Sequence, residues 1–235
     1  MDQEKCRIDY LGAVRFLVGT WLIYLAPPLL GWGVGNLRGF FSAAPRAGYA
    51  VLVLLLGLGV GVQALVAPEG IKGGRDSGPR VRRQSLVKIV VILVMYGGLT
   101  FLPFADRRGL AVLDVGSGVR WVGLVLVGLG YTLILWSGIA LGRFYSADVT
   151  LQQDHRLITG GLYRTLRHPR YLGVQTAALG LALLFRSWAG LALNVPLLAV
   201  LLFRIHDEEA LLRERFGAEW EAYCRHSWRL VPYLY

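Results

Sequence analysis

Long apolar runs are the feature that most restricts what this chain can fold into. Four runs each have about the 20 residues that a helix needs to cross a ~30 Å hydrocarbon core. They are Val14–Val34, Gly48–Ala67, Leu86–Phe104 and Val119–Leu141. The runs lack the alternation of strands, and an open sheet would leave backbone groups unpaired in lipid. They therefore predict transmembrane helices.

Two shorter apolar runs follow, Leu172–Phe185 and Trp188–Phe203, with Arg186-Ser187 between them. Each is short for a full span, and a tight helical hairpin, fully spanning or partly re-entrant, fits them better. The composition agrees, because 55% of the residues are hydrophobic and the mean hydropathy is +0.50. The sequence predicts an all-α, polytopic integral membrane protein with about six transmembrane helices, four long ones plus the hairpin.

The distribution of Lys and Arg predicts the orientation in the membrane. Of the 25 Lys and Arg residues, 19 fall near the two termini, in loop 68–88 and in segment 142–171, and 6 fall on the other side. Such an excess marks the cytoplasmic side, so we expect both termini and segment 142–171 in the cytoplasm. Topology and anionic headgroups then account for the net charge of +10, and nucleic acid is not an expected partner.

The stretch VLDVGSG at 112–118 raises a separate possibility. Many soluble methyltransferases carry a strand that ends in Asp-x-Gly-x-Gly, whose loop holds S-adenosylmethionine. Such a loop needs partner strands and an acidic residue roughly 20 positions further on. Here a membrane run follows Gly118, and the next acidic residue after Asp114 is Asp148. We therefore expect a short external turn before a transmembrane helix, not a cofactor site.

Polar residues collect in segment 142–235, which contains HRLITGGLYRTLRHPRYLG and then RIHDEEALLRERFGAEWEAYC. Arg204 and Glu208 are one turn apart on a helix, as a surface pair or as a charged pocket wall. An apolar stripe at helical spacing predicts a C-terminal amphipathic helix, which Gly217 weakens or breaks. The stripe comprises Leu211, Leu212, Phe216, Trp220 and Tyr223. The histidines and cysteines lack zinc-site spacing, so no metal is expected.

These two motifs, in this order, resemble the isoprenylcysteine carboxyl methyltransferase family of integral membrane methyltransferases, which is related to phospholipid methyltransferases. The resemblance covers residues 142–235 and implies that this part is the catalytic region, made of a cytoplasmic segment, the hairpin and the C-terminal helix. Residues 1–141 would form an N-terminal four-helix transmembrane region. The resemblance also implies S-adenosylmethionine as the cofactor.

Site residues follow from the resemblance alone. Arg204 would face the methyl acceptor, and Glu208 would take part in both catalysis and cofactor binding. The other implied cofactor contacts are Gln152, His155, Arg156, Leu157, Ile158, Tyr163, His168, Pro169, Arg170, Tyr171 and Glu209. The chemistry suits that cofactor, because Arg and His can bind its carboxylate, a carboxylate its sulfonium, and Tyr with aliphatic walls its adenine.

The acceptor and the activity have alternatives. The implied acceptor is the carboxylate of an isoprenylcysteine-like molecule, and a phospholipid or a small lipophilic molecule are also open. Membrane sterol reductases, which use NADPH, share a similar C-terminal Trp-x2-Tyr…Pro pattern. They tend to lack the proline of Arg-His-Pro and lack the Glu-Glu pair, whereas Pro169, Glu208 and Glu209 are present here. A non-catalytic membrane protein is the third interpretation.

Overall fold

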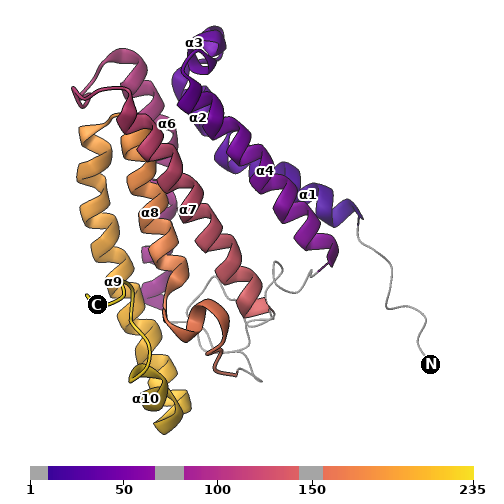
Figure 1. Ribbon diagram of the computed structural model, residues 1–235, viewed down its shortest axis with the longest axis vertical. Helices are drawn as coiled ribbons and strands as arrows, with labels where there is room; N and C mark the ends of the chain where they lie inside the picture. The colour runs from indigo at the N-terminus through magenta and orange to yellow at the C-terminus, as the bar shows by residue number, and fades with distance from the viewer. Residues whose placement is uncertain (1–9, 67–81, 143–155) are drawn as a thin grey trace.

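The computed structural model describes residues 10–66, 82–142 and 156–235, and these parts of the chain are almost entirely helical (Figure 1). The helices, in chain order, are α1 (Tyr10–Tyr24), α2 (Ala26–Trp32), α3 (Leu37–Phe41), α4 (Ala44–Val66), α6 (Arg82–Arg108), α7 (Gly118–Leu141), α8 (Pro169–Leu184), α9 (Trp188–Phe216) and α10 (Ala218–Cys224). Two short 3-10 helices, η1 (Val34–Asn36) and η3 (Gly161–Arg164), lie between them.

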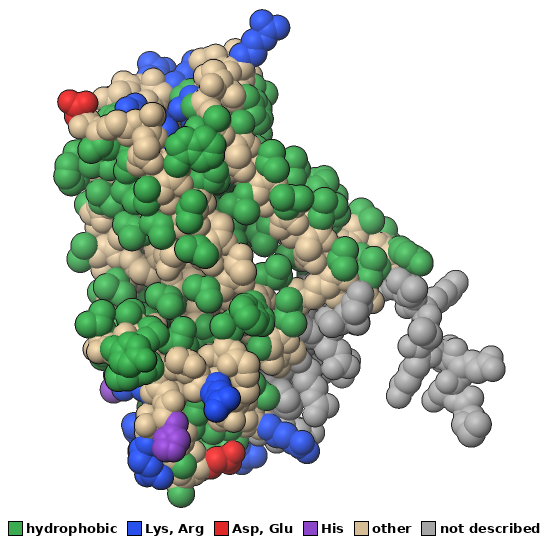
Figure 2. Space-filling model, in the orientation of Figure 1, with side chains coloured by type: hydrophobic (Ala, Val, Ile, Leu, Met, Phe, Trp, Pro, Cys, Tyr) green, Lys and Arg blue, Asp and Glu red, His purple; other side chains and the backbone are tan. Residues whose placement is uncertain are grey.

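The predicted helices are present in the described parts of the chain. Each of the six apolar runs forms helix, and four stretches are long and apolar enough to cross a membrane: Tyr10–Trp32, Ala44–Leu65, Gly118–Leu141 and Trp188–Phe216. A band of hydrophobic side chains separates two ends where Lys and Arg gather (Figure 2). The chain is therefore an integral membrane protein, as the sequence predicts.

Two details differ from the sequence prediction. The first run is interrupted at Leu25, because the prolines at the start of α2 lack backbone donors and suit only the first turn of a new helix. The predicted amphipathic stripe from Leu211 to Tyr223 is divided between two helices, because α9 continues through the charged residues to Phe216. Gly217, with φ of +49°, then ends it, and α10 follows as a helix of 7 residues with Trp220 buried.

The hairpin prediction is confirmed in form. Helices α8 and α9 pack against each other and are joined by a turn in which Arg186 has a φ of +48°. The apolar part of each arm is short: α8 has 16 residues, which gives a rise of about 24 Å. Arg204, Glu208 and the first turn of α8 therefore lie at one end of the hairpin, and Arg186 lies at the other.

The segment that resembles a soluble cofactor loop lies beside this Arg186 turn. Leu113 donates a backbone hydrogen bond to Arg186 (2.7 Å), and Trp188 donates one to Ala111 (2.9 Å). Helix α7 then begins at Gly118, so the prediction of a turn before a helix is confirmed. The segment is at the opposite end of the hairpin from Arg204 and Glu208, and its role is to brace the α8–α9 turn.

Among the described helices, α7 and α8 make the most extensive contact, and glycines make it possible. A Cβ on Gly130 of α7 would lie 2.5 Å from the backbone nitrogen of Ala177 and 2.6 Å from the carbonyl oxygen of Gly173. Gly123 and Gly180 repeat this relation two turns away. Because the two backbones touch, the antiparallel register of α7 and α8 is fixed, as in other membrane helix pairs that use small residues.

We predict that Gly130→Ala destabilises the protein, whereas Gly128→Ala on the same helix does not. The new methyl group at position 130 would collide with backbone that cannot move aside, at a cost of about 1–3 kcal/mol. A Cβ at position 128 meets only the Leu52 side chain at 3.8 Å, so its effect should stay within about 0.5 kcal/mol. Unfolding in detergent measures both, and equal stability of the two variants would contradict the backbone contact.

Candidate active site

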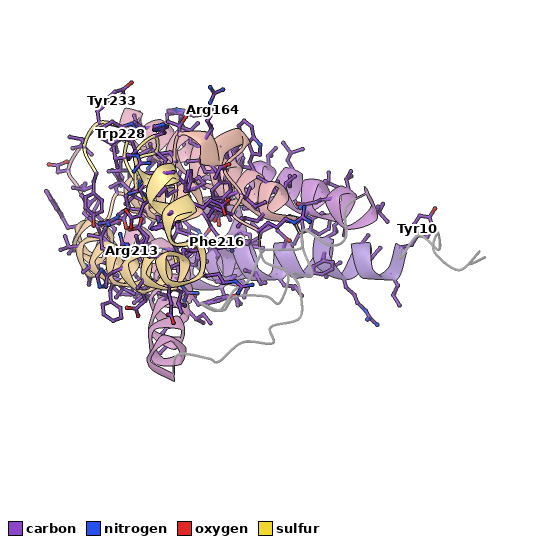
Figure 3. All side chains as sticks on the ribbon, turned by 90° about the horizontal axis from the view of Figure 1, so that it is seen from below. Tyr10, Arg164, Arg213, Phe216, Trp228 and Tyr233 are labelled. Atoms are coloured by element: carbon purple, nitrogen blue, oxygen red, sulfur yellow. The ribbon has the colours of Figure 1, made fainter. Side chains whose placement is uncertain are left out.

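The candidate site forms where α8 begins and the apolar part of α9 ends. His168 has non-helical dihedral angles and Pro169 is the first residue of α8, a position at which proline needs no backbone donor. This start directs Tyr171 of the first turn toward α9. Figure 3 looks onto this end of the molecule, where Trp228 and Tyr233 lie side by side near Arg164, far from Tyr10.

A tyrosine hydroxyl joins the two charged residues that the sequence singled out. Tyr171 Oη donates to Glu208 Oε2 at 2.7 Å and accepts from Arg204 Nε at 3.0 Å. All three side chains are half-buried. The structure thus brings together residues from the two arms of the hairpin, which lie 33 and 37 positions apart in sequence. Opposite charges are held on either side of the Tyr171 hydroxyl.

Tyr163 of η3 lies next to this group. The side chain of Tyr163 is buried, and its hydroxyl is 3.5 Å from the carbonyl oxygen of Ser137 on α7. The Tyr223 hydroxyl donates a hydrogen bond to the backbone carbonyl oxygen of Tyr163 at 2.6 Å. Burial, and next the negative charge of Glu208, raise the pKa of the Tyr163 hydroxyl, so the phenol stays protonated at neutral pH. Tyr163 therefore offers the site a flat, neutral ring.

The second glutamate of the pair, Glu209, faces a different set of neighbours. Glu209 is buried, with 4% of its side chain exposed, and three cationic or proton-bearing groups contact its carboxylate. These contacts are Arg167 Nε to Oε1 (3.0 Å), His168 Nε2 to Oε1 (3.2 Å) and Arg229 Nη2 to Oε2 (2.7 Å). Adjacent residues on a helix point about 100° apart, so Glu208 and Glu209 have different neighbours.

The contacts of Glu209 bind the C-terminal segment to the start of α8. Backbone hydrogen bonds run from Arg167 to Trp228 (2.8 Å), from His168 to Arg229 (3.1 Å) and from Trp228 to Thr165 (2.8 Å). The Arg167 guanidinium also donates to the carbonyl oxygens of residues 224 and 227. The network formed by Arg167, His168, Glu209 and Arg229, here called the Glu209 clasp, holds the segment that carries Tyr163 and Tyr171.

The remaining residues implied by the sequence are less closely grouped. Arg156 is exposed, and Leu157 and Ile158 are half-buried, in an irregular stretch ahead of η3. Arg170 lies near the end of α7, 4.0 Å from where a Cβ of Gly138 would be, and contributes a positive charge beside Tyr163. Gln152 and His155 lie outside the described residues.

Sequence reasoning missed two members of the clasp, Arg167 and Arg229. Both lie in the motif-bearing regions, but an arginine in a basic, membrane-proximal segment is normally assigned to the surface. The signal that was available is the run of three adjacent carboxylates, Asp207, Glu208 and Glu209, at the end of an apolar helix, because a carboxylate that becomes buried must find partners. The number of nearby arginines alone does not show which one reaches it.

Comparison with known proteins bears on the chemistry of this site. Residues 119–219 match the model of the family Phospholipid methyltransferase. This match confirms the resemblance seen in the motifs. It covers α7, α8 and α9, the helices that contribute Tyr171, Arg204 and Glu208.

Individual relatives include both methyltransferases and a steroid reductase. A probable protein-S-isoprenylcysteine O-methyltransferase of Oryza sativa subsp. indica is 32% identical over 119 residues, which are 49% of this chain and 62% of the relative. The Schizosaccharomyces pombe protein-S-isoprenylcysteine O-methyltransferase is 38% identical over 98 residues (40% and 42%). Steroid 5-alpha-reductase DET2 of Solanum lycopersicum is 33% identical over 115 residues (48% and 42%). The chain thus spans about three-fifths of the rice relative.

A solved structure gives the fold. The eukaryotic intramembrane Ras methyltransferase ICMT superposes with a TM-score of 0.51 over 96% of this chain and 97% of that one, at 17% identity. This similarity extends to the N-terminal helices, which carry no recognisable sequence motif, and supports the polytopic helical fold as a whole.

We predict that Glu209→Gln destabilises the protein far more than Glu214→Gln, a matched change at an exposed position of the same helix. The glutamine would leave two arginines and a histidine without their shared counter-charge. Breaking a buried pair costs roughly 3–5 kcal/mol, and the lower end is expected because Arg229 is 30% exposed. Denaturant unfolding of the purified variants compares them, and a loss below about 1 kcal/mol would show that the clasp is not needed for stability.

Proposed function

We propose that the protein is an S-adenosylmethionine-dependent methyltransferase that acts, within the membrane, on the carboxylate of an isoprenylcysteine-like acceptor. The observation that carries this proposal is the Arg204–Tyr171–Glu208 arrangement, which presents a cation and an anion on either side of a half-buried hydroxyl. The isoprenylcysteine methyltransferase relatives support the choice of reaction and acceptor.

The residues at this site fit the cofactor. Bound S-adenosylmethionine supplies an electrophilic methyl group on a cationic sulfonium. Glu208 provides a negative charge for that cation, and Arg170 a positive charge for its carboxylate. Tyr163, Leu157 and Ile158 would form the apolar wall for the adenine. We extend the same proposal to Gln152, His155, Arg156, His168 and Pro169, and to Glu209 through the clasp.

Methyl transfer to a carboxylate needs alignment and exclusion of water, and no general base. Arg204 has the geometry for this task, because a planar guanidinium can bind a carboxylate with two parallel hydrogen bonds. The Tyr171 hydroxyl fixes the orientation of Arg204 through its Nε and holds Glu208 at the same time. The position of the acceptor would therefore be coupled to the position of the cofactor through one side chain.

We predict different effects for changes at the two charged residues. Glu208→Gln keeps the size of the side chain but removes its charge, so affinity for S-adenosylmethionine should fall by roughly 1.5–3 kcal/mol, that of a lost interaction with a charged group. Arg204→Lys keeps the charge but loses the planar fork, so methyl transfer should slow while cofactor affinity largely survives. Calorimetry and transfer of a labelled methyl group to a farnesylated cysteine measure the two quantities.

Exposed positions on the same helix provide the controls. Glu214→Gln and Arg215→Lys make the same chemical changes and should leave both quantities unchanged. A farnesylated cysteine amide, which lacks the carboxylate, should not be methylated. Wild-type rates in both Arg204→Lys and Glu208→Gln would contradict the proposed site.

The sterol-reductase alternative keeps support from the tomato relative, which matches about as much of this chain as the rice methyltransferase does. The two hypotheses require different cofactors. Titration with S-adenosylmethionine and with NADPH separates them, and binding of NADPH alone would replace the present proposal. Binding of neither would favour a non-catalytic protein. A phospholipid or a small lipophilic molecule as the acceptor is tested by lipid mass spectrometry after methyl labelling.

The proposal places the site and both termini in the cytoplasm. It also divides the chain into an N-terminal four-helix transmembrane region, residues 1–141, and a catalytic region, residues 142–235. The excess of Lys and Arg supports this orientation. We predict that, in a chain without its native cysteines, Ser117→Cys reacts with a membrane-impermeant maleimide outside intact cells and Ser77→Cys reacts only after lysis. The reverse pattern would invert the topology.

A further inference from the structure

A second charged cluster lies at the other end of the hairpin from Tyr171, and the proposed reaction does not use it. Its centre is Asp106 of α6, whose side chain is only 1% exposed. Arg120 of α7 binds this carboxylate with two hydrogen bonds (2.7 and 2.8 Å). Arg46 of α4 approaches it to 3.5 Å and Arg186 of the α8–α9 turn to 3.6 Å. Three arginines thus share one carboxylate, which leaves two positive charges uncompensated within the cluster.

Two of the three arginines are fully engaged by the fold. Arg46 donates to the carbonyl oxygens of residues 40 (3.0 Å) and 39 (2.8 Å), and its guanidinium lies 4.3 Å from the centre of the Trp32 ring. Arg120 donates in addition to the carbonyl oxygen of Leu184 (2.7 Å). These contacts join α3, α4, α6, α7 and α8, so Arg46 and Arg120 have a structural role.

Arg186 differs from both. Its guanidinium makes a long ion pair with Asp106, but no described residue accepts a hydrogen bond from it. Its Nε is buried without a partner, while the side chain as a whole is 30% exposed. A guanidinium has five donors in a fixed fork, and leaving them unpaired in a low-dielectric setting is unfavourable. Since 30% of the Arg186 side chain is exposed, an acceptor from outside the protein can approach its guanidinium.

The surroundings indicate which acceptor is available. Trp121, next to Arg120, and Trp188, two residues after Arg186, are 50% and 59% exposed. Exposed tryptophans at the ends of membrane helices lie at headgroup depth. Figure 2 shows basic side chains gathered at this end, directly above the hydrophobic band. Asp114, the other described acidic residue at this end, is exposed. An anion at headgroup depth in a membrane is a lipid phosphate.

We propose that Arg186, with Asp106, Arg120 and Arg46 behind it, forms a binding site for the phosphate of an anionic lipid headgroup in the leaflet opposite the Tyr171 site. The guanidinium fork matches two phosphate oxygens, and the uncompensated charge of the cluster favours an anionic over a zwitterionic lipid. The backbone of residues 111–113 holds the turn, including the left-handed conformation of Arg186, so the backbone that carries the guanidinium is fixed before a lipid binds.

The test compares Arg186→Gln with Arg38→Gln, because Arg38 is an exposed arginine on α3 at the same end and each change removes one positive charge. Glutamine has a Cβ, as arginine does, so the backbone strain of the positive φ at position 186 is the same in the variant and the wild type. Phosphatidylglycerol is titrated into the delipidated protein in a neutral detergent, and binding is followed by native mass spectrometry and by thermal stability. Phosphatidylcholine and inorganic phosphate are titrated in parallel.

We expect phosphatidylglycerol to bind the wild type and Arg38→Gln alike, and to bind Arg186→Gln about fivefold to tenfold more weakly. Arg186→Lys, which keeps the cation and loses the fork, should show a smaller loss and decides the matter if Arg186→Gln does not fold. Wild-type affinity of the Arg186 variants for phosphatidylglycerol would overturn the site. A loss of affinity in Arg38→Gln as large as that in Arg186→Gln would overturn it too, because it would indicate only diffuse electrostatic attraction. Inorganic phosphate binding as tightly as the lipid would overturn the lipid assignment.

Discussion

The contact between the backbones of α7 and α8 is the constraint on which the arrangement of this protein depends. In lipid, apolar side chains gain little by leaving their surroundings, so helices associate where close approach allows many van der Waals contacts. The glycines at 123, 130, 173 and 180 allow this approach along the full length of α8. They fix where the first turn of α8 lies relative to α7, and hence where Tyr171 can reach α9.

Two adjacent glutamates on α9, Glu208 and Glu209, have different partners in the candidate site. Glu209 faces the C-terminal segment and stabilises it through arginines and a histidine, whereas Glu208 faces Tyr171. The clasp holds the segment before α8 in place, because its charges are paired with one another within the protein. Glu208, which is only half-buried, is the carboxylate that can respond to a bound cation.

The helices could be predicted from the sequence because a membrane leaves the backbone few alternatives. The break at Gly217 was also foreseen from residue type, and its positive φ is the reason. The continuation of the last apolar helix past Arg204 was expected as well, and the break at Gly217 sets its end at Phe216. The insertion of Tyr171 between Arg204 and Glu208, and the pairing of Asp106 with Arg120, depend on how distant helices pack. Spacing along one helix contains no information about either.

The shortness of α8 has a consequence for the membrane itself. The helix rises about 24 Å between the Arg186 turn and Pro169, whereas the hydrocarbon core measures about 30 Å. A bilayer adapts to such a mismatch by becoming thinner around the protein, or the polar end of the helix sinks below the headgroups. Thinning would keep Arg204 and Tyr171 at headgroup depth, whereas sinking would bring them to the depth of the uppermost acyl carbons. A lipid-anchored molecule diffusing in the plane of the bilayer would meet these residues without lifting its chain into water, and bilayers of different thickness would expose them to different extents.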